Sequence, residues 1–361
     1  MKKTIHIPIG SQHISLLEPV RFSFECENET IIKVEADVGY VHRGVELACT
    51  TKFKFKQVGY VVARVCGLCA IVHSTCYTLG IEELMGIEVP KRASYLRLIA
   101  NELDRIHSHL LCLAHTAENA GYEALFMRIM KDRELVMEIQ EAMTGNRIQF
   151  DYVSIGGVNK DINAELEGVI RSKLGLLRQK VAEIKELFDN NWSLSLKYKN
   201  VGVITKEAAY RSSLLGPIAR ASGVNFDVRN DSDYLPYSEL GFKSILMEGG
   251  DIHSRNMVRL FELFESIRLI ETALDGMPEG EISAKVRGTP EGESYMRVEA
   301  PRGECFYYLK ASKGQYLDRV RIKTPTFGSV PGMIEALKGS NYADVPAIIA
   351  SFDPCLSCTA R

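Results

Sequence analysis

Two cysteine pairs near opposite ends of the chain have the residue type and spacing that most directly indicate chemistry. They lie in Arg64-Val-Cys-Gly-Leu-Cys-Ala-Ile-Val-His73 and in Asp353-Pro-Cys-Leu-Ser-Cys-Thr-Ala-Arg361. Two intervening residues let both thiolates of a C-x-x-C pair turn toward one metal ion, and two pairs together offer four soft sulfur ligands. The sequence therefore predicts a metal centre formed by Cys66, Cys69, Cys355 and Cys358, which the whole fold must assemble.

Zinc is the simplest metal for four thiolates, and bare spacing alone would favour it. The two pairs are, however, far more distant than the roughly 15 to 20 residues over which zinc ribbons usually close. Three ionisable groups that a closed structural zinc site does not need, Arg64, His73 and Asp353, stand beside the cysteines. The second pair also ends three residues before the last residue, which is an unusual position for a structural site.

The two motifs resemble a known family. The first is similar to the R-x-C-G-x-C-x-x-x-H signature of nickel-iron hydrogenase large subunits, and the second to their D-P-C-x-x-C-x-x-[HR] signature. Further blocks that resemble the energy-converting, membrane-associated group of this family are Gly39-Tyr-Val-His-Arg-Gly-Val-Glu46, Glu102-Leu-Asp-Arg-Ile-His-Ser-His109, Ser154-Ile-Gly-Gly-Val158, Gly216-Pro-Ile-Ala-Arg-Ala-Ser-Gly223 and Glu299-Ala-Pro-Arg-Gly-Glu304. Several blocks are shared with the 49 kDa quinone-site subunit of respiratory complex I, but that relative lacks the four cysteines.

The resemblance implies a cofactor and a role for each sulfur. In the family, nickel is held by four thiolates, and two of these bridge to an iron that carries carbon monoxide and two cyanide ligands. By position, Cys66 and Cys355 are expected to be terminal ligands, and Cys69 and Cys358 bridging ligands. Soft thiolates suit the changes in nickel oxidation state that hydrogen chemistry requires.

The same resemblance implies candidates for handling the proton. Arg302 is expected to place its guanidinium over the metals and to orient ligands there; the alternative is an ordinary surface arginine. Glu18, in Leu17-Glu18-Pro19 after a turn at residues 10–13, resembles the carboxylate that passes protons between a cysteine ligand and the exterior; the alternative is an exposed loop acid. The thiolate of Cys355 is a third candidate base.

Other polar residues near the motifs have more open roles. His73 could be a fifth ligand, a core histidine, or a hydrogen-bond donor to a bridging sulfur, and the last fits the family and the general tuning of metal ligands. Asp353 is expected to anchor Arg302 or the C-terminal loop, or to cap the preceding helix. Ser108 stands where uptake hydrogenases have aspartate, so no carboxylate role carries over. Glu46 is expected to be structural, part of a proton route, or a small-subunit contact.

Partners follow from what the chain lacks. The remaining cysteines have no paired spacing, so buried apolar thiols are expected and no iron-sulfur cluster is predicted in this chain. Electrons must therefore leave through another subunit. The resemblance implies a small subunit with a [4Fe-4S] cluster, further iron-sulfur and ion-translocating membrane subunits, and reduced ferredoxin as the indirect donor for reversible hydrogen formation. The alternatives are a complex I-like quinone-site subunit and a zinc-binding assembly subunit without catalysis.

The elements that must position these residues are mainly helical. Apolar residues recur at spacings of three and four over residues 90–119, 123–143, 160–188 and 252–274, which predicts four long helices and a bundle core. Strands are predicted at residues 4–9, 20–26, 30–38, 295–298 and 304–320, with a turn at 27–29, and short helices at 332–338 and 342–350. The expected fold is α+β and predominantly α. The chain is expected to form one domain over residues 1–361, with a β-rich part (1–45), a helical bundle (90–275), a β-rich insertion (295–325) and a C-terminal metal-binding motif (353–361).

Composition excludes several classes of protein. With 44 basic and 46 acidic residues and no long run of one sign, the chain has no footprint for nucleic acid. No apolar run approaches the roughly 20 residues of a membrane span, and the first ten residues do not resemble a secretory signal. Nine cysteines, an odd number, argue against a disulfide framework. A peripheral position on the cytoplasmic face of the membrane is expected, and the end at Arg361 fits either a processed chain or a family member made without a tail.

Overall fold

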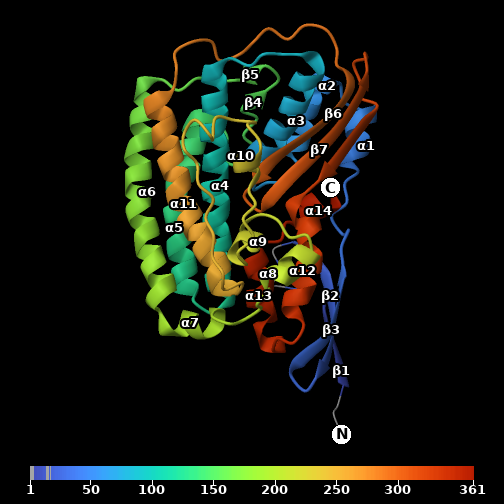
Figure 1. Ribbon diagram of the computed structural model, residues 1–361, viewed down its shortest axis with the longest axis vertical. Helices are drawn as coiled ribbons and strands as arrows, with labels where there is room; N and C mark the ends of the chain where they lie inside the picture. Colours follow the sequence, from blue (N-terminus) through green and yellow to red (C-terminus); the bar gives the residue numbers. More distant parts are fainter. Residues whose placement is uncertain (1–3, 14–15, 17) are drawn as a thin grey trace.

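The computed structural model describes residues 4–13, 16 and 18–361. Leu17 of the predicted Leu17-Glu18-Pro19 motif, residues 14–15, and residues 1–3 of the predicted β-rich part lie outside the described residues. Figure 1 shows long helices on one side of the molecule and a twisted sheet with short helices on the other. The predicted class, α+β and predominantly α, is confirmed.

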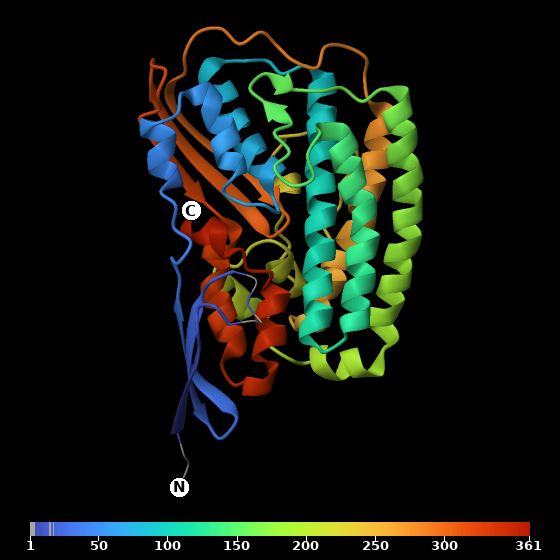
Figure 2. The same cartoon turned by 180° about the vertical axis from the view of Figure 1, so that it is seen from behind.

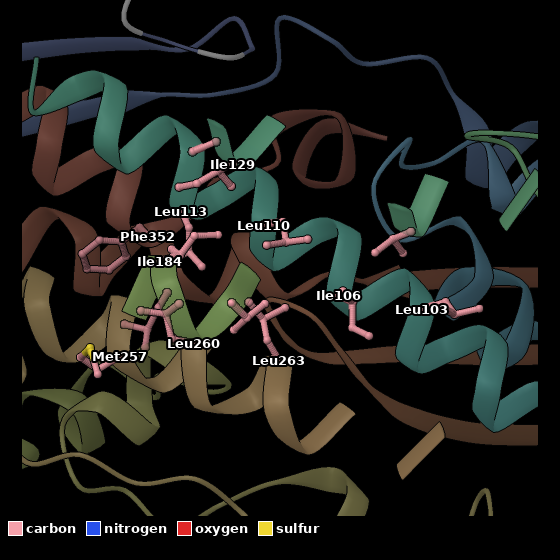
Figure 3. Packing of buried hydrophobic residues seen from close by; sticks show 14 of the residues in the cluster. Leu103, Ile106, Leu110, Leu113, Ile129, Ile184, Met257, Leu260, Leu263 and Phe352 are labelled. Atoms are coloured by element: carbon pink, nitrogen blue, oxygen red, sulfur yellow. The ribbon is translucent and has the colours of Figure 1, made fainter. Parts of the chain in front are cut away.

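Four long helices pack side by side as the predicted bundle (Figures 1 and 2). They are α4 (Lys91–Asn119), α5 (Glu123–Thr144), α6 (Ala164–Asn190) and α11 (Ile252–Gly276). Each begins and ends within a few residues of its predicted range because an apolar stripe continues over its length. Figure 3 shows the stripe of α4, from Leu103 to Leu113, against Leu260 and Leu263 of α11. The bundle thus forms most of the larger of two hydrophobic cores.

Three helices between residues 45 and 85 were not predicted. They are α1 (Val45–Thr51), α2 (Phe55–Ala63) and α3 (Ala70–Met85). Nearly every residue of α3 from Ala70 to Glu82 is buried, so the helix has no polar face and its sequence lacks the 3.6-residue alternation of a surface helix. α3 leads away from the first cysteine pair and packs on the sheet formed by strands within residues 291–323.

Among the described residues there are two antiparallel three-stranded sheets. The N-terminal sheet has the order β1 (Thr4–Ile9), β2 (Arg21–Glu27), β3 (Thr30–Asp37), and the second has the order β6 (Glu291–Ala300), β7 (Gly303–Ser312), β8 (Arg319–Lys323). The predicted turn after β2 is confirmed, with Asn28 in the left-handed region at φ 56°. The continuous strand predicted over 304–320 is wrong. The chain turns at Lys313, where φ is 58°, and the second half returns as β8.

The C-terminal helices stack between the N-terminal sheet and the bundle (Figure 1). They are α12 (Pro325–Leu337), η1 (Tyr342–Asp344), α13 (Val345–Phe352) and α14 (Leu356–Ala360). The start predicted at residue 332 is wrong. α12 begins at Pro325, a residue whose fixed φ suits the first helical position, and it accommodates Pro331 internally.

Shorter elements complete the chain. They are β4 (Val153–Ser154), β5 (Gly157–Val158), α7 (Trp192–Tyr198), α8 (Lys206–Arg211), α9 (Pro217–Ala221) and α10 (Val228–Asp231). Within the described ranges, no helix combines the length and apolar character needed to cross a membrane. A second hydrophobic core lies between α1–α3 and the sheet β6-β7-β8, and all four cysteines of the predicted metal centre belong to it.

Candidate metal centre

The four cysteines of the two C-x-x-C motifs converge at one buried point, called here the sulfur site. The Sγ atoms of Cys66 and Cys355 are 3.5 Å apart, and those of Cys355 and Cys358 are 3.1 Å apart. The sulfurs of Cys66, Cys69 and Cys358 all lie within 4.8 Å of one another. All four side chains are at most 3% exposed. The fold therefore brings together thiols from nearly opposite ends of the chain.

The first pair occupies the turn between α2 and α3. Cys69 is the residue directly before α3, a 16-residue helix. The backbone N–H of Leu68 donates to the Cys66 sulfur at 3.2 Å. Arg64, in contrast, points away and pairs with Asp151 at the surface.

The second pair spans the first turn of α14. Cys355 precedes the helix and Cys358 lies one turn inside it. The Cys355 N–H donates to the Thr326 hydroxyl at 3.1 Å, and the Thr324 hydroxyl donates to the Cys358 carbonyl at 3.1 Å. The start of α12 therefore fixes the position of this pair. Neither threonine was predicted as a site residue, because these hydrogen bonds join segments that meet only in the folded chain.

Arg302 lies beside the sulfurs, and each of its three guanidinium nitrogens donates one hydrogen bond. Its Nε donates to the Asp353 carbonyl oxygen at 2.8 Å, its Nη2 to the Asp353 carboxylate at 2.7 Å, and its Nη1 to the Ser108 hydroxyl at 3.0 Å. Arg302 is 4% exposed, so the expectation of a surface arginine is wrong. Ser108 thus occupies the guanidinium contact that a carboxylate could have made.

Asp353 takes an unusual backbone conformation to reach Arg302. Its φ is 53°, in the left-handed region, directly after α13. Burial raises the pKa of its carboxyl, while the charges of Arg302 and Arg259 act in the opposite direction. Its Oδ2 is buried without a hydrogen-bond partner among the described residues. Asp353 therefore anchors Arg302 with one oxygen and leaves the other free beside the site.

His73 lies one turn into α3, between the sulfur site and the sheet. Its Nε2 is 3.7 Å from the Cys358 sulfur, and its Nδ1 is 2.7 Å from the Tyr307 hydroxyl and 3.7 Å from the Cys305 sulfur. Burial lowers the pKa of His73, but the neighbouring Cys305 more than compensates, so the net shift is upward. This is the position expected of a donor to the Cys358 sulfur. Cys305 and Tyr307 were missed because single residues on a strand give no spacing signal.

Glu18 contacts the turn between the second pair of cysteines. Its carboxylate accepts hydrogen bonds from the Leu356 N–H, from the Ser357 N–H at 3.0 Å and from the Ser357 hydroxyl. It is half-buried, so the expectation of an exposed loop acid is wrong. The predicted turn before it is present, with the His13 N–H donating to Gly10 at 3.1 Å.

The C-terminal segment is held in place by charged contacts. Glu46 accepts from the Ile322 N–H at 2.9 Å, from Arg361 at 2.9 Å and from Arg321 at 3.2 Å. Arg43 donates to the carbonyl oxygens of Val65 and Ser357 at 2.8 and 3.0 Å, which ties the two cysteine-bearing segments together. Of the roles considered for Glu46, these contacts agree with the structural one.

The donor set fits soft metal ions. The neighbouring thiols of Cys355, Cys358 and Cys69 hydrogen bond to Cys66 and hold its pKa well below the ordinary value, so negative charge gathers on a buried sulfur. The guanidinium of Arg302 acts on the Cys66 sulfur, and it is already paired with Asp353. Four buried thiols with so little positive charge nearby match a centre that binds soft cations.

A second buried polar group, the bundle ion cluster, lies between the bundle and β6. Its members are Glu102, Arg105, Arg220, Asp227, Arg229, Glu262 and Glu299, all at most 2% exposed. Arg220 pairs with Glu262 at 2.7 Å, Glu299 at 2.8 Å and Asp227 at 3.0 Å. Four of these residues, Glu102, Arg105, Arg220 and Glu299, stand in the blocks quoted for the family resemblance. Their partners come from separate elements, so spacing could not reveal the cluster.

Comparisons with known proteins agree with this geometry. The family described as "Respiratory-chain NADH dehydrogenase, 49 Kd subunit" matches residues 119–289 and 285–361, and the family "Nickel-dependent hydrogenase" matches residues 43–117. The chain is 37% identical to the membrane-bound hydrogenase subunit alpha of Pyrococcus furiosus, over 100% of this chain and 89% of that protein. It is 36% identical to the carbon monoxide-induced hydrogenase of Rhodospirillum rubrum, over 99% of both.

A solved structure has nearly the same fold. A chain of the membrane-bound sulfane sulfur reductase, an archaeal respiratory membrane complex, matches with a TM-score of 0.94 and 28% identity, over 99% of this chain and 98% of that chain. The comparisons thus join hydrogenases, a sulfur reductase and the complex I subunit on one architecture.

Proposed function

Because this chain belongs to the family that unites the large subunits of energy-converting nickel-iron hydrogenases with the 49 kDa subunit of respiratory NADH dehydrogenase, we propose that it is the catalytic subunit of such a hydrogenase. It is a hydrogenase-type subunit of a membrane-bound oxidoreductase complex. The proposed reaction is the reversible reduction of protons to hydrogen with electrons from reduced ferredoxin, coupled to ion translocation by membrane subunits.

The observation that carries this proposal is the convergence of four buried thiols. Cys66 and Cys355 would hold nickel as terminal ligands, and Cys69 and Cys358 would bridge it to iron. When bound, this group, with carbon monoxide and two cyanide ligands on iron, supplies the redox chemistry that splits and forms hydrogen. The short distances from the Cys355 sulfur to those of Cys66 and Cys358, 3.5 and 3.1 Å, support this assignment, because sulfurs that close can bind the same metal ions.

The surrounding residues would orient ligands and move protons. Arg302, fixed by Asp353 and Ser108, presents a rigid cation at the edge of the sulfur site, where a planar fork can donate to an anionic ligand. His73 would donate from Nε2 to the Cys358 sulfur and tune its basicity. Glu18 would take a proton from the Cys355 thiol at its carboxylate and release it away from the site.

Electron transfer would require a partner. In the described part of the chain, the other cysteines are buried singly or in contacts that do not form a further metal-binding group. We therefore expect a small subunit with a [4Fe-4S] cluster, linked to further iron-sulfur and membrane subunits. A peripheral position on the cytoplasmic face of the membrane is part of the same proposal.

Sulfur reduction is the second candidate function, because the structural match is to a sulfane sulfur reductase. That reaction would use the same thiols with a different substrate. A quinone-site role, as the 49 kDa family match suggests, would not require four converging thiols. Nor would a zinc-binding assembly role require the Arg302 fork or Glu18.

The test compares the isolated complex with a Cys66→Ser variant. We expect nickel and iron in equal amounts, infrared bands of metal-bound carbon monoxide and cyanide, and hydrogen evolution from reduced ferredoxin. Cys66→Ser should lose the nickel and all hydrogen evolution, since one terminal ligand is gone. Zinc alone would refute the proposal, and polysulfide reduction without hydrogen evolution would establish the second candidate.

A further inference from the structure

A small cavity connects Glu18 with a histidine that the site has not yet used. It has a volume of about 20 Å³, and the polar side chains that line it are Glu18, His115 and Asn119. The other described residues of its lining are apolar, such as Leu16 and Ile349. A cavity needs roughly 10 to 15 Å³ to hold one water molecule, together with at least two polar partners. This cavity meets both conditions for a single water.

His115 lies between that cavity and an exposed carboxylate. Its Nδ1 is 2.9 Å from a carboxylate oxygen of Glu118, which is 48% exposed. Since Glu118 engages Nδ1, Nε2 is the ring nitrogen left for a water in the cavity. An imidazole that accepts a proton at Nε2 can release another from Nδ1 without moving.

The neighbours of His115 hold the ring in this position. Its side chain is 17% exposed, and the ring packs on Phe126 of α5 with centroids 5.5 Å apart. The Asn119 amide donates to the His115 carbonyl at 2.9 Å. The charged groups that face the imidazole are Glu118 on its own helix and Glu18 across the cavity, while α13 contributes apolar residues.

We propose that protons travel between Glu18 and the surface through one water in this cavity, then His115, then Glu118. The inference deepens the proposed function and rests on it. Going outward, Glu18 gives its proton to the water, and the water protonates His115 at Nε2. His115 releases its Nδ1 proton to Glu118, which returns it to solvent. Each bond broken to hydrogen is matched by one formed, and no electrons move.

The first measurement uses the isolated complex under D₂ in H₂O buffer. The ratio of H₂ to HD that appears reports how often both deuterons are exchanged before the gas leaves, and it does not depend on the fraction of complex that carries metal. We expect His115→Gln to lower this ratio roughly tenfold, because a blocked exit returns the deuteron to the gas. Imidazole added to His115→Ala should restore the ratio.

His253→Gln is the matched control. His253 lies on another bundle helix, its side chain is 15% exposed and it is 3.9 Å from Asp189, but it does not line the cavity. This variant should keep the parental ratio. A His115→Gln ratio equal to that of His253→Gln would overturn the proposal and show that Glu18 exchanges with solvent directly.

A second measurement needs no metal and keeps the two proposals separable. Nuclear magnetic resonance of histidine-labelled chain should show that Glu18→Gln shifts the ring nitrogen resonances of His115 and leaves those of His253 unchanged, since the water bridge from the His115 ring to a carboxylate is lost. Unchanged His115 resonances would overturn the exit route. The absence of any H–D exchange in the parental complex would instead count against hydrogen chemistry itself.

Discussion

In the bundle ion cluster four carboxyl groups face three guanidinium groups, whereas in the sulfur site four thiols face one guanidinium that Asp353 already engages. Burial raises the pKa of Glu299 to about 7, so one carboxyl of the cluster can hold a proton and the charges then balance. The sulfur site has no such internal balance. The difference teaches that the charges of the bundle ion cluster are balanced by its own side chains. The thiols of the sulfur site, in contrast, need cations that the chain does not supply.

The largest effect should come from unbalancing the cluster. Arg220→Met leaves Glu262, Glu299 and Asp227 buried without their shared cation, and we expect the free energy of unfolding to fall by about 3 to 5 kcal/mol. Denaturant unfolding of the metal-free chain measures this. Arg297→Met is the control, since its pair with Asp231 is exposed and should be worth less than about 1 kcal/mol. Equal losses in the two variants would mean that the cluster does not stabilise the fold.

The second effect should appear in turnover alone. Arg302→Lys keeps a positive charge beside the thiols but cannot reproduce three bonds from one planar fork. We expect both metals to remain bound, by metal analysis, while hydrogen evolution falls roughly 100-fold. Ser108→Ala removes one of the three bonds and should cost less than about tenfold. Unchanged turnover in Arg302→Lys would remove this guanidinium from the mechanism.

The smallest effect concerns pH. Burial lowers the pKa of His109, which contacts Glu262 of the cluster, to about 4 from an ordinary 6.5. Between these values the unfolded chain binds a proton that the folded chain does not, so stability is full above pH 6.5 and falls as pH drops toward 4. The free energy of unfolding is expected to fall by about 1 kcal/mol for each pH unit in this window. Unfolding curves of the parent and His109→Gln should converge over this window, and parallel curves would show that His109 does not contribute.

The bundle was predictable because its helices alternate apolar and polar faces. The stripe of α4 runs from Leu96 to Leu113, and the predicted ends hold to within a few residues. α3 was not predicted because burial on all sides removes that alternation. The turn after β7 was missed although Ser312-Lys313-Gly314 is a turn-like sequence, because strand-like residues resume within a few positions. Residues 313–318 separate β7 from β8, and Lys313 takes the left-handed conformation there.

The candidate site was predictable only in part. Paired spacing identified the four cysteines, and the resemblance identified Arg302, Asp353, His73 and Glu18, whose contacts the structure now supplies. Thr326, Tyr307, Cys305 and His115 gave no signal. Each acts through a neighbour on another element, and such a partnership exists only after the chain has folded.

The proximity of the two cysteine pairs has a consequence for the stability of the fold. Cys66 and Cys355 stand 289 positions apart in the sequence, yet their sulfurs touch. A metal ion bound by both cysteines would close a loop of that length as a disulfide does. In the chain-entropy model this closure would raise the free energy of unfolding by roughly 6 kcal/mol. Chelators should therefore free the last helix to fray before any other part of the protein melts.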